Sequence, residues 1–367
     1  MKTLLIYGLL VFVLFFYLKP IEAVAIPADQ VAVLIKSWAI PMTSNQNSSF
    51  ALTSSFSGNE IYYVDSDSNK IGRLVPETNT ITEWDIPTAN SFPISIAYHP
   101  SGNVYFIEGN SNKIGRLVPE TNTITEWTIQ SNSSSGLSAG NNSGIGNNTT
   151  QSAALAVDSS TGNVYFIEGN SNKIGRLVPE TNTITEWTIQ SNSSSGLSAG
   201  NNSGIGNNTT QSAALAVDSS TGNVYFIEGN SNKIGRLVPE TNTITEWTIQ
   251  SNSTNIKSMA LGFAGNEEIY YVDSDSNKIG RIAPATNLVT EWDIPTANSF
   301  PTSVKFDRAT GNIYFLESNS NTIGRLGPFS SQITEWKLPE KPFDIEVDSA
   351  GSIHYIDVKG TKIVRMD

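Results

Sequence analysis

Seven carboxylates occupy the same place in a motif that repeats along the chain. Each one ends a short apolar and aromatic run such as VYFIE, and the seven are Asp65, Glu108, Glu168, Glu228, Asp273, Glu317 and Asp357. Carboxylate oxygens suit a hard divalent cation such as Mg²⁺ or Ca²⁺, helped by neighbouring asparagine amides. One chemistry that the sequence allows is therefore a cation or ligand site lined by these side chains.

Arginines recur on the next run of the same motif and offer the carboxylates structural partners. They are Arg73, Arg116, Arg176, Arg236, Arg281, Arg325 and Arg365. Repeated ionic networks perturb carboxylates without being functional sites. The sequence favours these ion pairs and leaves the cation site as the alternative.

The sequence has few residues that could support other kinds of catalytic or metal site. The chain has no cysteine, which excludes thiolate metal sites, cysteine nucleophiles and disulfides. It has two histidines, His99 in a predicted turn and His354 at the start of a predicted strand, both far from the strand ends that carry the carboxylates. No Ser-His-Asp arrangement or histidine metal cluster can be assembled from them.

The elements that would position the carboxylates follow from the repeat. NKIGRLVPETNTITEW recurs in variant form, and its copies start 40 to 60 residues apart, at Asn69, Asn112, Asn172, Asn232, Asn277, Asn321 and, truncated, Thr361. That period is typical of four short strands per unit. In the second unit, PISIAYHP, VYFIE, KIGRLV and TITEWTI have strand composition and are separated by the turn sequences SGN, GNSN and PETN. Such units form the blades of a β-propeller.

The two ends of the chain predict how the ring closes. The last unit stops after its third strand, and residues 31–41 resemble a missing fourth strand. All seven tryptophans share one position on that strand: Trp38, Trp84, Trp127, Trp187, Trp247, Trp292 and Trp336. We therefore predict an all-β, seven-bladed propeller of four-stranded antiparallel blades, closed by an N-terminal strand that pairs into the C-terminal blade.

Two side chains of the fourth strand have predicted roles. We expect the tryptophans to pack between adjacent blades. We expect the glutamates of TEW to be solvated edge charges that discourage association between sheets, at Glu83, Glu126, Glu186, Glu246, Glu291 and Glu335.

The N-terminus predicts export. Residues 1–25 have the pattern of a secretory signal peptide, with an uncleaved anchor as the alternative. We expect residues 26–367 to form the propeller and to be secreted or displayed at the cell surface. A net charge of -12 argues against nucleic-acid partners. We expect a monomer that meets a membrane only through an uncleaved N-terminal segment.

Two inserted tracts interrupt the repeats. Residues 131–152 and 191–212 are rich in serine, asparagine and glycine, a composition that predicts mobile loops and contains N-glycosylation sequons. Residues 103–162 and 163–222 are identical, which indicates recent duplication or gene conversion, with an error in gene assembly as the alternative.

The repeated NKIGRL, ITEW and trailing IP, preceded by strands such as YFIE, resemble the streptogramin lyases, also called virginiamycin B lyases. The resemblance covers residues 31–367. It implies a magnesium-assisted elimination that opens a cyclic depsipeptide, with histidines just after a proline at the start of the first strand in late blades. The matching positions hold Thr302 and Phe343, and Lys341 matches an acidic partner. Neither Thr302 nor Phe343 can act as a base near neutral pH, so the family reaction is expected to be disabled.

We therefore expect an exported, non-catalytic propeller that binds a surface ligand or small molecule. Two enzymatic alternatives remain open. One is a divalent-cation-dependent C–O lyase of the virginiamycin B lyase type with a rearranged site. The other is a gluconolactonase-like hydrolase, whose metal would be held by Glu, Asn and Asp.

Overall fold

A computed structural model describes residues 35–41, 50–129, 154–168, 173–189, 215–228, 232–249, 256–262, 268–357, 359 and 361–366. Residues 33–367 form one compact unit, distinct from residues 1–32. The predicted signal segment and the inserted tracts at 131–152 and 191–212 lie outside the described residues. Within the described ranges, no helix is long and apolar enough to cross a membrane.

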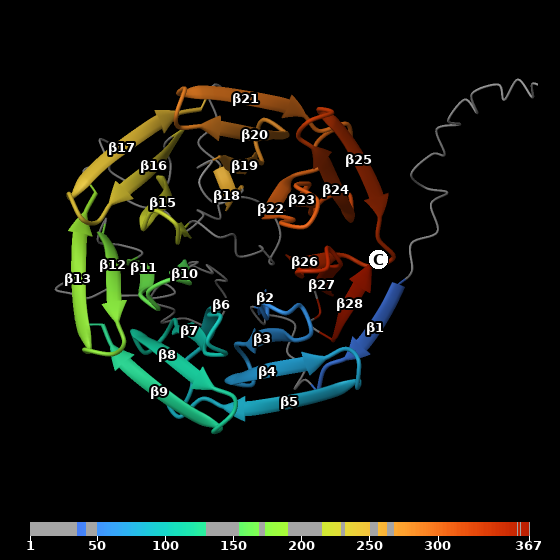
Figure 1. Ribbon diagram of the computed structural model, residues 1–367. Coiled ribbons are helices and arrows are strands. Elements are labelled where there is room, and N and C mark those ends of the chain that lie inside the picture. The colour runs from blue at the N-terminus through green and yellow to red at the C-terminus, as the bar shows by residue number, and fades with distance from the viewer. Residues whose placement is uncertain are drawn as a thin grey trace, which may run out of the picture. The chain divides into compact units, whose positions relative to one another are not determined.

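Seven four-stranded antiparallel sheets make up the compact unit, and Figure 1 shows them arranged as blades in a ring. The strands of blades 1 to 4, each given from the innermost outward, are β2 (Phe50–Ser54), β3 (Ile61–Asp65), β4 (Lys70–Val75) and β5 (Thr80–Asp85); β6 (Pro93–Tyr98), β7 (Val104–Glu108), β8 (Lys113–Val118) and β9 (Thr123–Thr128); β10 (Leu155–Val157), β11 (Val164–Glu168), β12 (Lys173–Val178) and β13 (Thr183–Thr188); and β14 (Leu215–Asp218), β15 (Asn223–Glu228), β16 (Lys233–Val238) and β17 (Thr243–Thr248).

The strands of blades 5 to 7, in the same order, are β18 (Ile256–Leu261), β19 (Ile269–Asp273), β20 (Lys278–Ala283) and β21 (Leu288–Asp293); β22 (Pro301–Phe306), β23 (Ile313–Glu317), β24 (Thr322–Gly327) and β25 (Gln332–Lys337); and β26 (Pro342–Val347), β27 (Ile353–Asp357), β28 (Lys362–Met366) and β1 (Ile35–Ala39). The predicted fold class is confirmed.

Blade 7 is completed by the N-terminal strand. β1 runs antiparallel to β28, with Trp38 opposite Ile363 and Lys36 opposite Arg365. Figure 1 shows β1 on the outside of β28, in the place that β5 has in blade 1. The predicted closure is confirmed. It satisfies an edge of β28 that would otherwise expose unpaired backbone groups.

The hydrophobic core is divided among the contacts between blades. Val64 and Trp84 of blade 1, for example, belong to one buried cluster with Phe106 and Leu117 of blade 2. Strand residues alternate between the two faces of a blade, so each blade contributes apolar side chains to both of its neighbours. The fold therefore depends on every blade being flanked on both sides.

The tryptophans pack between blades, as predicted. Trp84 is 8 % exposed, and its indole N–H donates to the Oδ1 atom of Asn122 in the next blade over 2.8 Å. The same bond joins Trp38 to Asn79 at 2.8 Å. These two indoles therefore contribute both buried apolar area and a directed bond to the neighbouring blade.

Candidate functional site

The predicted carboxylates lie where the sequence placed them, each at the end of the second strand of its blade. Those whose side chains are described are all buried: Asp65, Glu108, Glu228, Asp273, Glu317 and Asp357. The Glu168 side chain lies outside the described part of the chain. These groups are therefore interior side chains, with little surface to offer to a ligand.

Their partners belong mostly to the turn that follows in the same blade. Asp65 Oδ1 accepts from the backbone N–H of Asp67 at 3.1 Å and of Ser68 at 3.3 Å. Asp357 Oδ1 accepts from the N–H groups of Thr361 and Lys362 at 2.7 and 2.9 Å. Such bonds satisfy backbone donors that a tight turn leaves without strand partners.

The predicted ion pairs with arginine are wrong. Arg73 lies opposite Tyr62 in the sheet register, whereas Lys70 lies opposite Asp65. Arg73 pairs with Glu60 at 3.2 Å, and its guanidinium carbon lies 5.5 Å from the ring centre of Trp84. The cause is the strand register, which carries the arginines away from the carboxylate end of the blade and places six of the seven over a tryptophan face.

The glutamates of TEW also differ from the prediction. Glu126 is half-buried, and its Oε2 atom lies 2.8 Å from Lys113 Nζ of the adjacent strand. Its Oε1 atom accepts from the backbone N–H of Thr88, in the linker from the preceding blade, at 3.0 Å. Glu335 accepts from Thr296 in the same way at 3.0 Å. These glutamates join blades together, so they are not solvated edge charges.

Two versions of a buried polar network occur in the blades. In blade 1, the Tyr63 hydroxyl donates to Glu83 at 3.1 Å, and the second strand ends in Asp65. In blade 2, Phe106 replaces the tyrosine, and Glu108, whose Oε2 atom accepts from the Ser111 hydroxyl at 2.7 Å, is close enough to Glu126 of the outer strand for the charge of Glu126 to raise the pKa of Glu108. A proton retained on this pair would supply the donor that the missing tyrosine hydroxyl would have supplied.

The glutamate pairs have perturbed titration. Burial, reinforced by the negative charge of Glu126, raises the pKa of Glu108 to about 7. Burial and the charge of Glu335 raise the pKa of Glu317 in blade 6 to about 7. The Oε1 atoms of Glu108 and Glu317 are buried without a hydrogen-bond donor. A retained proton explains both observations, because two carboxylates in contact cannot both ionise at low cost.

A metal donor set is not gathered at these positions. Within the described ranges, no three or more acidic or histidine side chains are grouped closely enough to hold a metal ion. Each described carboxylate instead serves its own blade. The residues present therefore do not fit the magnesium ion that the resemblance implies, and Mg²⁺ or Ca²⁺ binding by the seven carboxylates stays a prediction.

The positions that match the family histidines are occupied by packed side chains. Thr302, 3 % exposed on β22, has its hydroxyl 2.8 Å from that of Ser318. Phe343, 2 % exposed on β26, packs edge-on against Phe50 with ring centres 5.8 Å apart. Lys341 is half-buried just before β26. Neither packed side chain is left free to approach a substrate.

Inner-strand charges near these positions were missed from the sequence. Lys305 Nζ on β22 lies 2.8 Å from Glu346 Oε2 on β26. Asp344 accepts from the backbone N–H of Leu52 at 3.2 Å, and burial raises its pKa to about 6. The bonds join blades 6, 7 and 1. The available signal was Asp344 and Glu346 at alternate positions of PFDIEV, together with Lys305 in PTSVKF.

One buried lysine also escaped sequence analysis. Lys257 on β18 is buried, and its Nζ atom lies 5.9 Å from the ring centre of Phe300. Burial lowers the pKa of Lys257.

The two histidines do not join this region by any described bond. His354 is fully buried with its Nε2 atom 2.9 Å from Asp348 Oδ2, and His99 lies 2.7 Å from the Ser101 hydroxyl.

The fold and its closure define the molecule as a seven-bladed β-propeller with an N-terminal strand in its last blade. Within that class, residues 198–367 match the virginiamycin B lyase family. This confirms the resemblance to the streptogramin lyases that the repeated motifs indicated. No curated protein matches the chain in sequence.

Solved structures of streptogramin lyases share the fold over most of their length. A streptogramin B lyase structure is 22% identical, with a TM-score of 0.72, over 91% of this chain and 97% of the other. Virginiamycin B lyase from Staphylococcus aureus is 23% identical, with a TM-score of 0.70, over 91% and 99%. A catalytically inactive histidine-to-alanine variant of that enzyme with quinupristin is 23% identical, with a TM-score of 0.68, over 91% and 99%. Likeness at these identities establishes the fold.

Proposed function

We propose that this chain is an exported, non-catalytic β-propeller that binds a surface ligand or small molecule on a scaffold similar to that of the streptogramin lyases. The observation that supports it is the replacement of two family histidine positions by Thr302 and Phe343, both buried in packing contacts. Export rests on the pattern of residues 1–25.

An elimination needs a group that removes a proton and whose pKa lies near the working pH. The Thr302 hydroxyl is bonded to Ser318, and Phe343 has no proton-transfer group. The solved histidine-to-alanine variant from Staphylococcus aureus is itself described as catalytically inactive. By analogy, a chain without histidines at these places lacks the base for the family reaction.

One observation favours the lyase alternative. Glu317 has its pKa raised to about 7 by burial, and it directly precedes Ser318, the hydrogen-bond partner of Thr302. An acid of that pKa is a suitable general base at neutral pH. Glu317 is fully buried, however, and its Oε2 atom accepts from the Ser320 hydroxyl of the turn that follows at 3.2 Å, which supports a structural role.

Incubation with quinupristin tests the two roles directly. The purified chain, with Mg²⁺ present, should release no ring-opened product by mass spectrometry above the buffer control, while a streptogramin lyase run in parallel does. A ring-opened product would overturn the non-catalytic role. If Glu317→Gln then abolished that product and a variant of the exposed turn residue, Glu120→Gln, did not, Glu317 would be the base.

Calorimetric titration with Mg²⁺ and Ca²⁺ tests the cation site separately. We expect no saturable binding, because Asp273 and its counterparts are buried in their own blades. Saturable binding that disappears in Asp273→Asn and persists in Asp275→Asn would instead assign a metal to the predicted carboxylates.

A further inference from the structure

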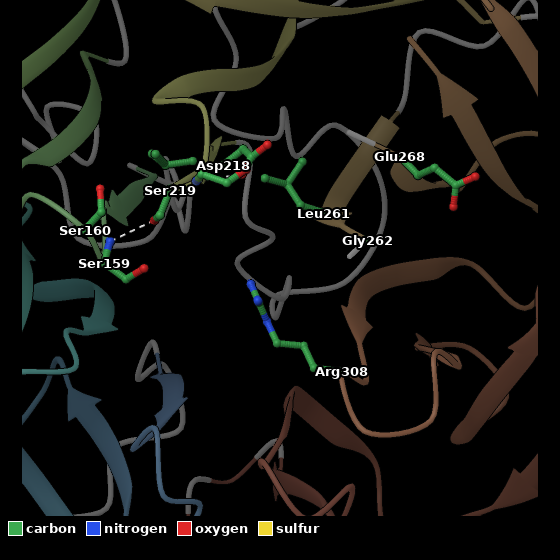
Figure 2. A pocket seen from close by; sticks show the side chains of 10 residues that line it. Ser159, Ser160, Asp218, Ser219, Leu261, Gly262, Glu268 and Arg308 are labelled. Atoms are coloured by element: carbon green, nitrogen blue, oxygen red, sulfur yellow. Dashed lines mark hydrogen bonds between the residues drawn. The ribbon is translucent and has the colours of Figure 1, made fainter. Parts of the chain in front are cut away.

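A cavity of about 370 Å³ lies among the turns that join the first and second strands of blades 3 to 6. The carboxylates described above lie at the other end of these strands. The cavity is therefore on the opposite face of the propeller from the positions that match the family histidines. Figure 2 shows the lining side chains, which include Ser159, Asp218, Ser219, Leu261 and Arg308.

The cavity lies where one blade lacks a polar side chain that other blades have. In blades 3, 4 and 6 an aspartate at the end of the first strand, or directly after it, accepts the backbone N–H of the residue two positions later, at 2.9 Å in each: Asp158, Asp218 and Asp307. Blade 5 has Gly262 at this position. This position of blade 5 therefore contributes no carboxylate to the cavity.

Arg308 supplies a positive charge to the cavity. It is the exposed residue after Asp307 in the turn between β22 and β23. In Figure 2 its guanidinium points into the cavity, and no hydrogen bond joins it to the other lining residues. A guanidinium binds a carboxylate through two parallel N–H···O bonds, so an unengaged arginine in a cavity favours a ligand that carries a carboxylate.

Asp218 supplies the complementary acceptor. It is 7 % exposed; its Oδ1 atom accepts from the Ser220 hydroxyl at 2.6 Å, whereas its Oδ2 atom is buried without a hydrogen-bond partner. Blade 3 has the identical turn sequence DSSTGN, and there Asp158 Oδ2 accepts from the Thr161 hydroxyl at 2.6 Å. An unmet acceptor of this kind is costly and favours a donor brought by a ligand.

We propose that this cavity binds a small zwitterion, with the ligand carboxylate on Arg308 and the ligand ammonium on Asp218. The proposal deepens the binding role given above and rests on it. Asp218 Oδ2 is buried in a turn that lines the cavity, so contact with the ammonium requires the carboxylate to rotate and to exchange its Oδ1 bonds from Ser220 for the bond to the ligand. Leu261 and Val217 add apolar lining, which favours an amino acid or short peptide with an aliphatic side chain.

Charge and size exclude other ligand classes. Asp218 lines the cavity and would repel a phosphate dianion, whereas a zwitterion carries an ammonium group that Asp218 attracts; Glu268 is already paired with Arg281 at 3.3 Å. The volume is at the small end of ligand pockets, which occupy roughly 300–1,000 Å³. A free amino acid and a short peptide share this chemistry, and the chain length of the probe distinguishes them.

Calorimetry with four probes tests the assignment on the full chain. Leucine or leucyl-leucine should bind saturably. Tighter binding of leucine would identify the ligand as a free amino acid, and tighter binding of leucyl-leucine would identify it as a short peptide. N-acetyl-leucine, which lacks the ammonium, and leucinamide, which lacks the carboxylate, should each bind at least tenfold more weakly. No saturable binding of either zwitterion, or equal binding of all four probes, would overturn the proposal.

Variants assign the two charges. Arg308→Gln and Asp218→Asn should each weaken binding of the zwitterion at least tenfold, while the matched variant Asp158→Asn, in the identical turn of blade 3, changes it less than twofold. Unchanged melting temperatures establish that the variants fold, and Arg308 is exposed enough to be replaced safely. Equal losses in Asp158→Asn and Asp218→Asn would overturn the site, yet the quinupristin result would still stand on its own.

Discussion

Trp84 of blade 1 donates its indole N–H to the side-chain oxygen of Asn122 in blade 2, at 2.8 Å. Asn122 has a φ of 53°, in the left-handed region where asparagine is enriched among the residues other than glycine. One asparagine thus shapes the turn of its own blade and accepts the tryptophan of its neighbour. The relationship repeats between Trp187 and Asn242 at 2.6 Å and between Trp247 and Asn287 at 2.8 Å.

Replacing Asn122 should separate these two roles. Asn122→Gly keeps the left-handed turn and loses the bond to Trp84, which should cost about 1 kcal/mol of unfolding free energy. Asn122→Ala loses both and should cost a further ~1 kcal/mol because a Cβ atom disfavours the left-handed backbone. Urea unfolding measures both values. Glu120→Ala, an exposed change in the same turn, should have almost no effect; equal costs for glycine and alanine would contradict the backbone role.

Stability should fall as pH rises through neutrality because of the glutamate pairs. The pKa of Glu108 is raised from 4.5 to about 7, so the folded state binds a proton that the unfolded state has released. The stabilisation is fully present below pH 4.5 and is lost as pH rises through 7. At 1.36 kcal/mol per pKa unit it amounts to about 3 kcal/mol at most, less the opposite contribution of Glu126, whose pKa is lowered.

Glu108→Gln should flatten that dependence. Glutamine has an N–H donor that does not titrate and can take the place of the protonated carboxyl beside Glu126. We expect the fall in melting temperature between pH 5 and pH 8 to be smaller in this variant than in the wild type, with Glu120→Gln as the control. An unchanged slope would show that Glu108 is ionised throughout this range.

The glycine of the KIGR motif should tolerate no side chain. A Cβ atom built on Gly115 would lie 2.0 Å from the ring carbon Cζ of Phe106 on the adjacent strand. The ring covers the glycine, so Gly115→Ala should cost about 3 kcal/mol or more through overpacking. Adding Phe106→Leu removes the far end of the ring and should restore part of the loss. If the single variant melted like the wild type, the close approach of the ring would not exist in solution.

The sequence predicted the fold well because strand identity and order are repeated. Seven copies of one motif gave the blades, and the position shared by Trp38 and Trp84 gave the closure. The strands follow from local alternation of apolar and polar residues, and the closure follows from the need to pair the open edge of the last sheet. Both can be inferred without knowledge of any long-range contact.

The candidate site was predicted less well, because its contacts depend on register and on neighbouring blades. Arg73 looked like a partner for Asp65, but the register sets it opposite Tyr62. Glu126 looked like an exposed charge, but its partners include Thr88 of the preceding linker. The sequence shows that the two positions change together: blade 1 has Tyr63 and Asp65, whereas blade 2 has Phe106 and Glu108. The sequence does not show the polar contacts that explain this paired substitution.

Removal of the closing strand should destabilise the whole propeller. A chain that begins after Pro41 lacks β1, exposes the edge of β28 and loses Trp38, which is 6 % exposed and bonded to Asn79. Loss of one buried tryptophan alone should cost at least ~3 kcal/mol, and the unpaired edge adds to this and invites self-association. Thermal melting and light scattering measure both effects. Ile35→Ser, a change at an exposed β1 residue, should leave them unaltered, because Ile35 is 45% exposed. An unchanged melting temperature in the shortened chain would contradict closure by β1.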